Sequence, residues 1–202
     1  MKSITIAIFS LLISSCLFAQ TEKMKDSPLP YHEIPAAHDS YTAGSVAART
    51  IDGLGYRYYW ATEGINEDVL NYEPGNEGRK AADVLEHLFG LSDMIKNATL
   101  GEPNIRPLQN VPTDFADLRK ATLNNLQAAS EKLREAKDED LNEMKIIFKR
   151  GEKESSFPFW NLLNGPIDDA LTHVGQIVSY RRSAGVPQSP KVNVFMGKNR
   201  QQ

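Results

Sequence analysis

The sequence lacks several features that would place it at once in a known class of proteins. It has a single cysteine, Cys16, which excludes an internal disulfide and a cysteine-cluster metal site. Its 23 Lys and Arg are outnumbered by 26 Asp and Glu, and the net charge of −3 argues against a nucleic-acid binder that relies on neutralising phosphates. Low-complexity segments are absent, which excludes a wholly disordered chain. The 202 residues, 41% of them hydrophobic, suit one domain with one core.

The longest apolar run lies at the N-terminus. A positively charged start is followed by an almost unbroken apolar stretch, residues 4–12, and then by small residues up to Ala19. This pattern predicts a signal peptide over residues 1–19, cleaved near Ala19, and therefore a periplasmic or secreted protein. The alternative is a lipoprotein signal, because residues 13–16 loosely fit a lipid-attachment box. In that case Cys16 carries a lipid and the protein is bound to a membrane.

Four later segments have the 3.6-residue periodicity of amphipathic helices. They follow a polar, proline-containing leader arm, residues 20–37. In the first segment, apolar residues recur from Ala47 to Ile65 at spacings of 4, 3, 4, 3 and 4. We predict one domain over residues 38–202: an all-α, antiparallel four-helix bundle with one longer crossover and an irregular C-terminal tail. The predicted helices span residues 39–65, 78–98, 113–137 and 165–184.

Two connections differ from simple helix turns. The segment after the second helix contains Pro107 and Pro112, which predicts a loop. Between the third and fourth helices, residues 144–149 and 155–159 are short β-prone runs that flank a charged turn at residues 150–152. This pattern predicts a small β-hairpin before the fourth helix.

Polar and glycine residues near the helix ends give further expectations. Asp39 or Ser40 is predicted to cap the first helix and Thr113 the third, because short polar side chains accept hydrogen bonds from free backbone N–H groups. Gly53 and Gly55 lie inside the first helix, where each costs about 1 kcal/mol relative to Ala. We expect them to allow another backbone to approach closely.

Two of the four histidines lie beside the apolar stripes of predicted helices. His87 in the second helix and His173 in the fourth each follow an aspartate by four residues, Asp83 and Asp169 respectively, so each pair shares a helix face. Converging in a bundle core, these pairs would offer two imidazoles and two carboxylates, which suit a divalent ion such as Zn, Ni, Mn or Fe. The alternative is that both histidines are hydrogen-bonded structural residues.

A polar stripe at spacings of 4, 3 and 4 residues runs along the predicted fourth helix. It consists of Asp169, His173, Gln176 and Tyr180. Such a stripe is more typical of a lined cleft than of a solvated face, which usually carries Lys and Glu, and we expect Gln176 and Tyr180 to orient a substrate. Arg181 and Arg182 follow in the last turn, where a positive charge complements the helix dipole. Anion binding is the alternative for these arginines.

The stretch from His173 to Pro187 resembles the H-x-G-Q-x-x-x-Y-x-R-x-x-G-x-P signature of the DinB-like (YfiT-like) superfamily. Residues 84–88 resemble the second-helix histidine segment of that family, in the same order and separation. The resemblance extends over about residues 39–187. It implies a four-helix bundle, often dimeric, in which one histidine of helix two and two of helix four, spaced H-x-x-x-H, hold a divalent metal ion.

Carried over by position, these ligands are His87, Asp169 and His173, with Asp83 as a candidate extra ligand. The chain departs from the family at Asp169, where the family has a histidine. A carboxylate still binds Zn, Mn or Fe, and sets of two histidines and one carboxylate are ordinary for zinc and non-haem iron. The departure nevertheless leaves open which metal binds and whether any does.

The resemblance also implies a chemistry, in which the metal lowers the pKa of a bound water or thiol. We therefore expect a metal-dependent hydrolase or thiol transferase that acts on a small molecule. The alternative is a non-catalytic, ligand-binding or structural bundle of the cell envelope with a vestigial metal site. The expected partners are a small-molecule ligand and a second copy of the chain, with no nucleic acid, and a membrane only if Cys16 is lipidated.

Overall fold

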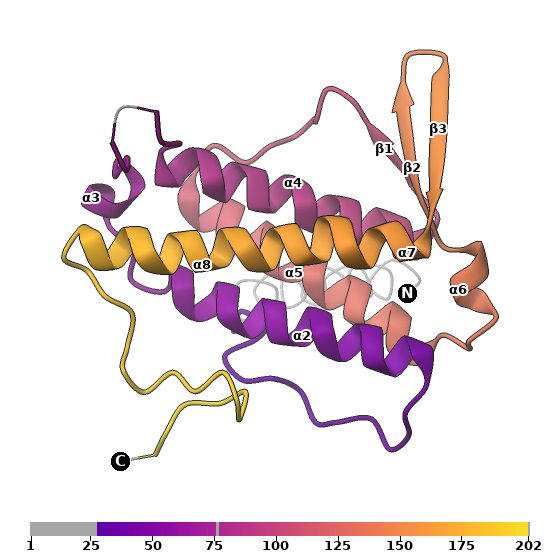
Figure 1. The fold of residues 1–202 in the computed structure, drawn as a ribbon, viewed down its shortest axis with the longest axis horizontal. Coiled ribbons are helices and arrows are strands. Elements are labelled where there is room, and N and C mark those ends of the chain that lie inside the picture. Colours follow the sequence, from indigo (N-terminus) through magenta and orange to yellow (C-terminus); the bar gives the residue numbers. More distant parts are fainter. Residues whose placement is uncertain (1–27, 76, 202) are drawn as a thin grey trace, which may run out of the picture.

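The structure is a computed structural model that describes residues 28–75 and 77–201. The predicted signal peptide, residues 1–19, and the predicted lipid attachment at Cys16 lie outside the described residues. Four long helices pack together in the described part (Figure 1). They are α2 (Ala43–Thr62), α4 (Ala81–Leu100), α5 (Phe115–Glu135) and α8 (Asp168–Ser183).

Short elements complete the described part of the chain. The short helical pieces are α3 (Glu67–Leu70), α6 (Asp140–Glu143), α7 (Phe159–Leu162) and the π-helical turn η1 (Leu163–Ile167). The strands are β1 (Pro103–Ile105), β2 (Lys145–Arg150) and β3 (Lys153–Pro158). Among the described residues, no helix combines the length and the apolar character needed to cross a membrane.

The four long helices form a ring in which α5 packs against α2 and α4, and α8 packs against the same two helices from the other side (Figure 1). The colours of Figure 1 show that α2 and α8 run in one direction and α4 and α5 in the other. The neighbours α2–α5 and α4–α8 are therefore antiparallel, as predicted, whereas α4–α5 and α2–α8 are parallel. Residues 101–114 make this possible, because an extended chain gains up to about 3.3 Å per residue and can return along a helix of about 30 Å.

The predicted apolar stripes form the core between these helices. In α2, the stripe from Ala47 to Ala61 is buried, while Ile65 lies beyond the end of the helix and is only partly buried. The stripe of α4 is buried as well, from Val84 to Ile95. Burial of these stripes is a main driving force for the packing of α2 and α4 into the bundle.

Helix α2 begins later than predicted. Its N-cap is Thr42 and not Asp39 or Ser40. The backbone N–H of Ser45 donates to the Thr42 hydroxyl at 3.1 Å, and the backbone N–H of Thr42 donates to the Ser45 hydroxyl at 2.9 Å. This reciprocal capping box satisfies two free backbone donors at once.

The two glycines inside α2 behave differently. A Cβ at Gly55 would lie 2.5 Å from the ring of Tyr31, so this glycine does allow a close approach, of a side chain from the arm before α2. A Cβ at Gly53 would meet only the side chain of Arg57, at 3.3 Å. The expected approach of another backbone is therefore wrong at both positions, and at Gly55 a side chain takes that place.

The third and fourth long helices also start differently from the prediction. Asp114 caps α5 instead of Thr113, because its carboxylate accepts from two backbone N–H groups. The fourth helical segment begins at Phe159, through α7 and η1, rather than at residue 165. Pro166 lies inside η1, where the wider π turn accommodates a residue that cannot donate a backbone hydrogen bond.

The predicted hairpin is confirmed, and it belongs to a larger sheet. Strands β2 and β3 pair antiparallel, with Arg150 opposite Lys153 at the turn. Strand β1, which the sequence did not predict, pairs parallel to β2 on its other side. The amide of Asn104, buried in β1, donates to the carbonyl of Ile147 at 3.0 Å. The bundle is thus a mostly helical domain with a small three-stranded mixed sheet.

The arm before α2 is held against the bundle by a buried carboxylate. Asp52 of α2 is 1% exposed and forms an ion pair with Arg134 of α5. It also accepts a hydrogen bond from the Ser130 hydroxyl at 2.6 Å and one from the Tyr31 hydroxyl at 3.3 Å. This cluster joins the arm, α2 and α5, so the described part of the predicted leader arm is packed and not free.

Candidate functional site

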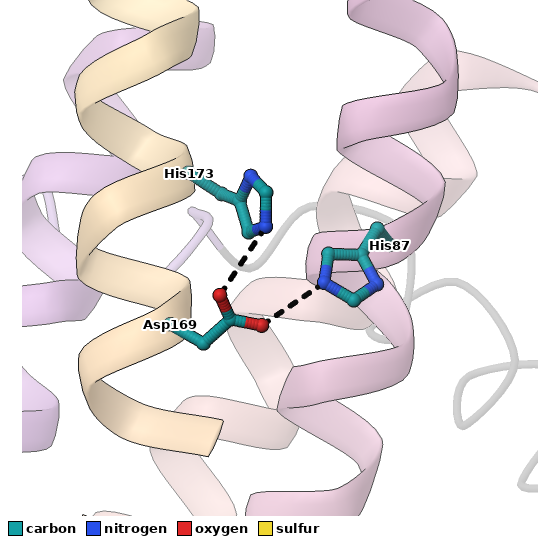
Figure 2. Close-up of side chains that lie close together, drawn as sticks. All are labelled: His87, Asp169 and His173. Atoms are coloured by element: carbon teal, nitrogen blue, oxygen red, sulfur yellow. Dashed lines mark hydrogen bonds and ion pairs between the residues drawn. The ribbon is translucent and has the colours of Figure 1, made fainter. Parts of the chain in front are cut away.

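The three residues predicted as metal ligands lie together between α4 and α8. His87 lies in the second turn of α4, Asp169 in the first turn of α8, and His173 one turn further along α8. Figure 2 shows the Asp169 carboxylate between the two imidazoles. Its Oδ2 is 3.1 Å from His87 Nε2, and its Oδ1 is 3.3 Å from His173 Nε2. The antiparallel packing of α4 and α8 thus brings together residues that are 82 positions apart.

The spacing of the donor atoms fits a metal ion. One ligand atom from each of the three residues lies within 4.8 Å of the others. Ligands about 2.1 Å from a tetrahedral ion are about 3.4 Å apart, so side-chain adjustments of about 1 Å would close the set around an ion. Because His87 and His173 contribute nitrogens and Asp169 an oxygen, this group could hold a divalent ion of the zinc or iron type.

Gln176 orients His173 within this group. Its side-chain Oε1 lies 2.7 Å from His173 Nδ1, so Nδ1 is the donor of that hydrogen bond. In a neutral imidazole the proton on Nδ1 leaves a lone pair on Nε2, which points toward the Asp169 carboxylate. A lone pair facing a carboxylate is satisfied by a cation between them, and this arrangement is the usual one for a metal-binding histidine. Gln176, predicted to orient a substrate, thus contacts a candidate ligand.

The site is open to solvent on the His87 side. The side chains of His87 and Asp169 are 37% and 45% exposed, whereas that of His173 is 16% exposed. A pocket of about 520 Å³ adjoins His87 and has a mixed lining of charged and apolar residues. Besides His87, its lining consists of Arg79, Asp83, Glu86, Gly90, Leu91, Met94, Arg106 and Leu108.

Two of the residues predicted for the site lie elsewhere. Asp83 lines the pocket beside His87 but does not belong to the group of converging donor atoms. Tyr180 packs against Tyr72, with ring centroids 5.4 Å apart, and is not among the residues that line the pocket. Helical spacing places them on the same faces as His87 and His173, but each lies one or two turns away along its helix.

Arg181 has a structural role that the sequence did not indicate. The residue is 3% exposed, and its Nη1 donates to the carbonyls of Trp60, Ala61 and Glu63 at 2.9 to 3.1 Å. These carbonyls lie at the C-terminal end of α2, where backbone acceptors have no partner within the helix. The Nε of Arg181 donates to the carbonyl of Val186, just after its own helix, at 2.7 Å. The charge of Arg181 thus complements the dipole of a neighbouring helix as well as that of its own helix.

Comparison with known proteins identifies no relative of this chain. The donor group of His87, Asp169 and His173 therefore has to be judged on its own chemistry. No protein-family model matches the chain, and no curated protein or solved structure matches it either.

Proposed function

We propose that this protein is a DinB-like four-helix bundle that binds a divalent transition-metal ion through His87, Asp169 and His173. The supporting observation is that two imidazole Nε2 atoms from different helices face the same carboxylate, at 3.1 and 3.3 Å. These residues have the order and spacing that the resemblance to that superfamily implies, with Asp169 in place of the middle histidine. The orientation of His173 by Gln176 supports the proposal independently of the resemblance.

The proposed reaction is a metal-dependent hydrolysis or thiol transfer on a small molecule. Three protein ligands leave a position of the ion open, and an ion there lowers the pKa of a bound water or thiol toward neutrality. The open position of the ion would face the solvent-exposed side of the group, because His87 and Asp169 are its exposed members. The adjoining pocket of about 520 Å³ falls within the size range of small-molecule sites.

A non-catalytic binding protein is the second candidate, and the surroundings of the group favour it. Among the described residues, Asp169 is the only carboxylate in the converging group. Glu63, a conceivable general base one turn after Tyr59, is instead paired with Arg119 at 2.6 Å. Asp83 and Glu86 line the adjoining pocket but stand outside the converging group. If neither carboxylate acts on the bound molecule, the bundle would hold a ligand without turning it over.

The cellular setting is a separate proposal. The signal-like pattern of residues 1–19 supports export to the periplasm or the medium, with lipid attachment at Cys16 as the alternative. The intact mass of the protein recovered from the cell envelope distinguishes a chain that begins after Ala19 from one that begins at a lipidated Cys16.

Metal analysis tests the proposed function directly. The full chain is purified without chelator, its metal content is measured, and zinc is titrated into the metal-free protein by calorimetry. We expect about one ion per chain, and a loss of affinity of about 100-fold or more in His173→Ala. His38→Ala is the matched control, because His38 is exposed and, among the described residues, hydrogen-bonds only with Ser40. Sub-stoichiometric metal that His173→Ala leaves unchanged would contradict the proposal.

Turnover separates the two candidates once binding is shown. The zinc-loaded and metal-free proteins are compared for hydrolysis of activated esters and for transfer of a small thiol to an electrophile. Metal-dependent turnover that falls in His173→Ala supports the enzyme. Stoichiometric binding without turnover supports the binding protein.

A further inference from the structure

The C-terminal tail carries an exposed apolar turn. After α8 the tail extends along the side of the bundle formed by α2 (Figure 1). In it, the side chains of three consecutive residues, Val194, Phe195 and Met196, are exposed, and Phe195 is 92% exposed. An isolated exposed apolar residue is ordinary, but three adjacent ones at one turn call for an explanation.

Local hydrogen bonds hold the turn in this shape. The backbone N–H of Gly197 donates to the carbonyl of Asn193 at 2.9 Å, and the backbone N–H of Met196 donates to the Asn193 side chain at 3.2 Å. Gly197 has a φ of +68° and lies so close to Ile34 that a Cβ there would be 2.6 Å from that side chain. The turn therefore requires glycine, and its backbone is shaped to project the three side chains.

The turn is also fixed to the bundle. The Tyr56 hydroxyl of α2 accepts from the backbone N–H of Asn193 at 3.1 Å and donates to the side chain of Asn199 at 3.0 Å. The backbone N–H of Ile34 donates to the carbonyl of Gly197 at 2.7 Å. These contacts join both sides of the turn to the body, so the apolar tip cannot bury itself by folding back without breaking them.

Positive charge surrounds the apolar tip. Lys191, Lys198 and Arg200 are exposed, and residues 186–201 contain no Asp or Glu. The backbone N–H of Arg200 donates to the carbonyl of Lys191 at 2.8 Å, which brings the basic residues on the two sides of the turn together. None of the three forms an ion pair with another described residue. This cationic surface stands out on a chain whose net charge is −3.

We propose that this turn is a membrane-binding element that inserts Val194, Phe195 and Met196 into the interface of an anionic lipid membrane. The basic residues beside the turn would contact the lipid headgroups. Apolar side chains on one side and Lys or Arg around them are what an anionic bilayer surface attracts, the first by burial and the second by charge. The proposal depends neither on the metal site nor on a lipid at Cys16.

Vesicle binding of the full chain tests this proposal. The protein is sedimented with vesicles of phosphatidylcholine alone and with vesicles that contain roughly one-third phosphatidylglycerol. We expect binding to the anionic vesicles that weakens with added salt, and a loss of about tenfold in Phe195→Ser. Replacing Lys191, Lys198 and Arg200 together by Gln should weaken binding to the anionic vesicles by about 100-fold, since each charge contributes about fivefold.

Matched variants control for general effects of charge and exposed aromatic groups. Trp160→Ser removes an aromatic side chain that is 75% exposed on α7. The triple change of Lys149, Arg150 and Lys153 to Gln removes three exposed charges from the hairpin. Neither should change binding. Because the N-terminal segment is the same in every variant, differences among them report on the turn.

Two results would overturn the proposal. One is vesicle binding that Phe195→Ser leaves unchanged, or that is equal on neutral and anionic vesicles. The other is self-association in light scattering that Phe195→Ser abolishes, without vesicle binding, which would assign the tip to an interface between two copies of the chain.

Discussion

Two carboxylates, Asp52 and Asp169, are each bound by side chains of two different segments, but in opposite surroundings. Asp52 is 1% exposed and has a permanent cation, Arg134, and two hydroxyl donors as partners. The side chain of Asp169 is 45% exposed and faces two imidazoles, which carry a charge only when protonated.

The difference separates a completed cluster from an incomplete one. All the charge and hydrogen bonds that Asp52 needs are supplied by the chain, so the cluster can only stabilise the fold. Asp169 and its histidines offer lone pairs from three directions, and a divalent cation would satisfy all of them. A carboxylate between histidines on packed helices is therefore a better indicator of a site than a buried ion pair is.

The largest expected effect is on stability. Asp52→Asn leaves Arg134 without its partner and weakens the contact with Tyr31, which should lower the free energy of unfolding by about 3 kcal/mol. Asp169→Asn, measured without metal, should change it by less than about 0.5 kcal/mol. Urea denaturation of both variants measures the contrast. Equal losses would show that the two carboxylates do not differ in this way.

Zinc should raise the stability cost of changing Asp169 to about that of changing Asp52. At 100 times its dissociation constant, an ion that binds only the folded state stabilises by about 2.7 kcal/mol. We expect this increment in the native chain and in Asp52→Asn, and its absence in Asp169→Ala. Thermal unfolding with and without zinc measures it. A zinc-dependent increase that survives in Asp169→Ala would place the ion elsewhere.

The role of Gln176 gives a smaller effect. Gln176→Leu removes the hydrogen bond to His173 Nδ1 and should weaken zinc binding about tenfold to 100-fold, with little change in stability without metal. Tyr180→Phe is the control, because Tyr180 packs on Tyr72 and not on the ligands. Calorimetric titration measures the zinc affinity of the two variants. If both bind zinc equally well, Gln176 does not support the site.

The completed cluster should also be sensitive to alkali. Burial, and then the negative charge of Asp52, raise the pKa of Tyr31 above its ordinary value of 10.0, because both disfavour the phenolate. The folded state thus favours the neutral hydroxyl, and stability should be constant below pH 10 and fall above it by up to about 1.4 kcal/mol per pH unit for each tyrosine whose pKa is raised. Tyr31→Phe should reduce this slope. Part of it should remain, since burial raises the pKa of Tyr58 to about 12.

The elements that depend on local pattern were predictable from the sequence. The stripes of α2 and α4 follow directly from apolar spacing, and the hairpin from two β-prone runs around a turn. His87, Asp169 and His173 could be proposed together because helical spacing fixes faces and the resemblance supplied the pairing of helices.

What the sequence did not predict depends on contacts between distant segments. Strand β1 has only three residues, and its one buried residue is the polar Asn104. It forms because its backbone and the Asn104 side chain bond to β2. Asp83 shares a helix face with His87, but helical spacing does not show which turn of α4 lies opposite Asp169 and His173 of α8. The parallel packing of α4 and α5 follows from the path of a connection, which amphipathic periodicity does not encode.

The contacts of Arg181 affect the site, although Arg181 lies far from it along α8. Arg181 lies eight residues after His173 on α8, or about 12 Å along the axis, and its donors are fixed to the end of α2. A helix held at one point cannot slide along its neighbours. The height of His173 relative to His87 is therefore determined at the opposite end of α8, by a residue that touches neither of them.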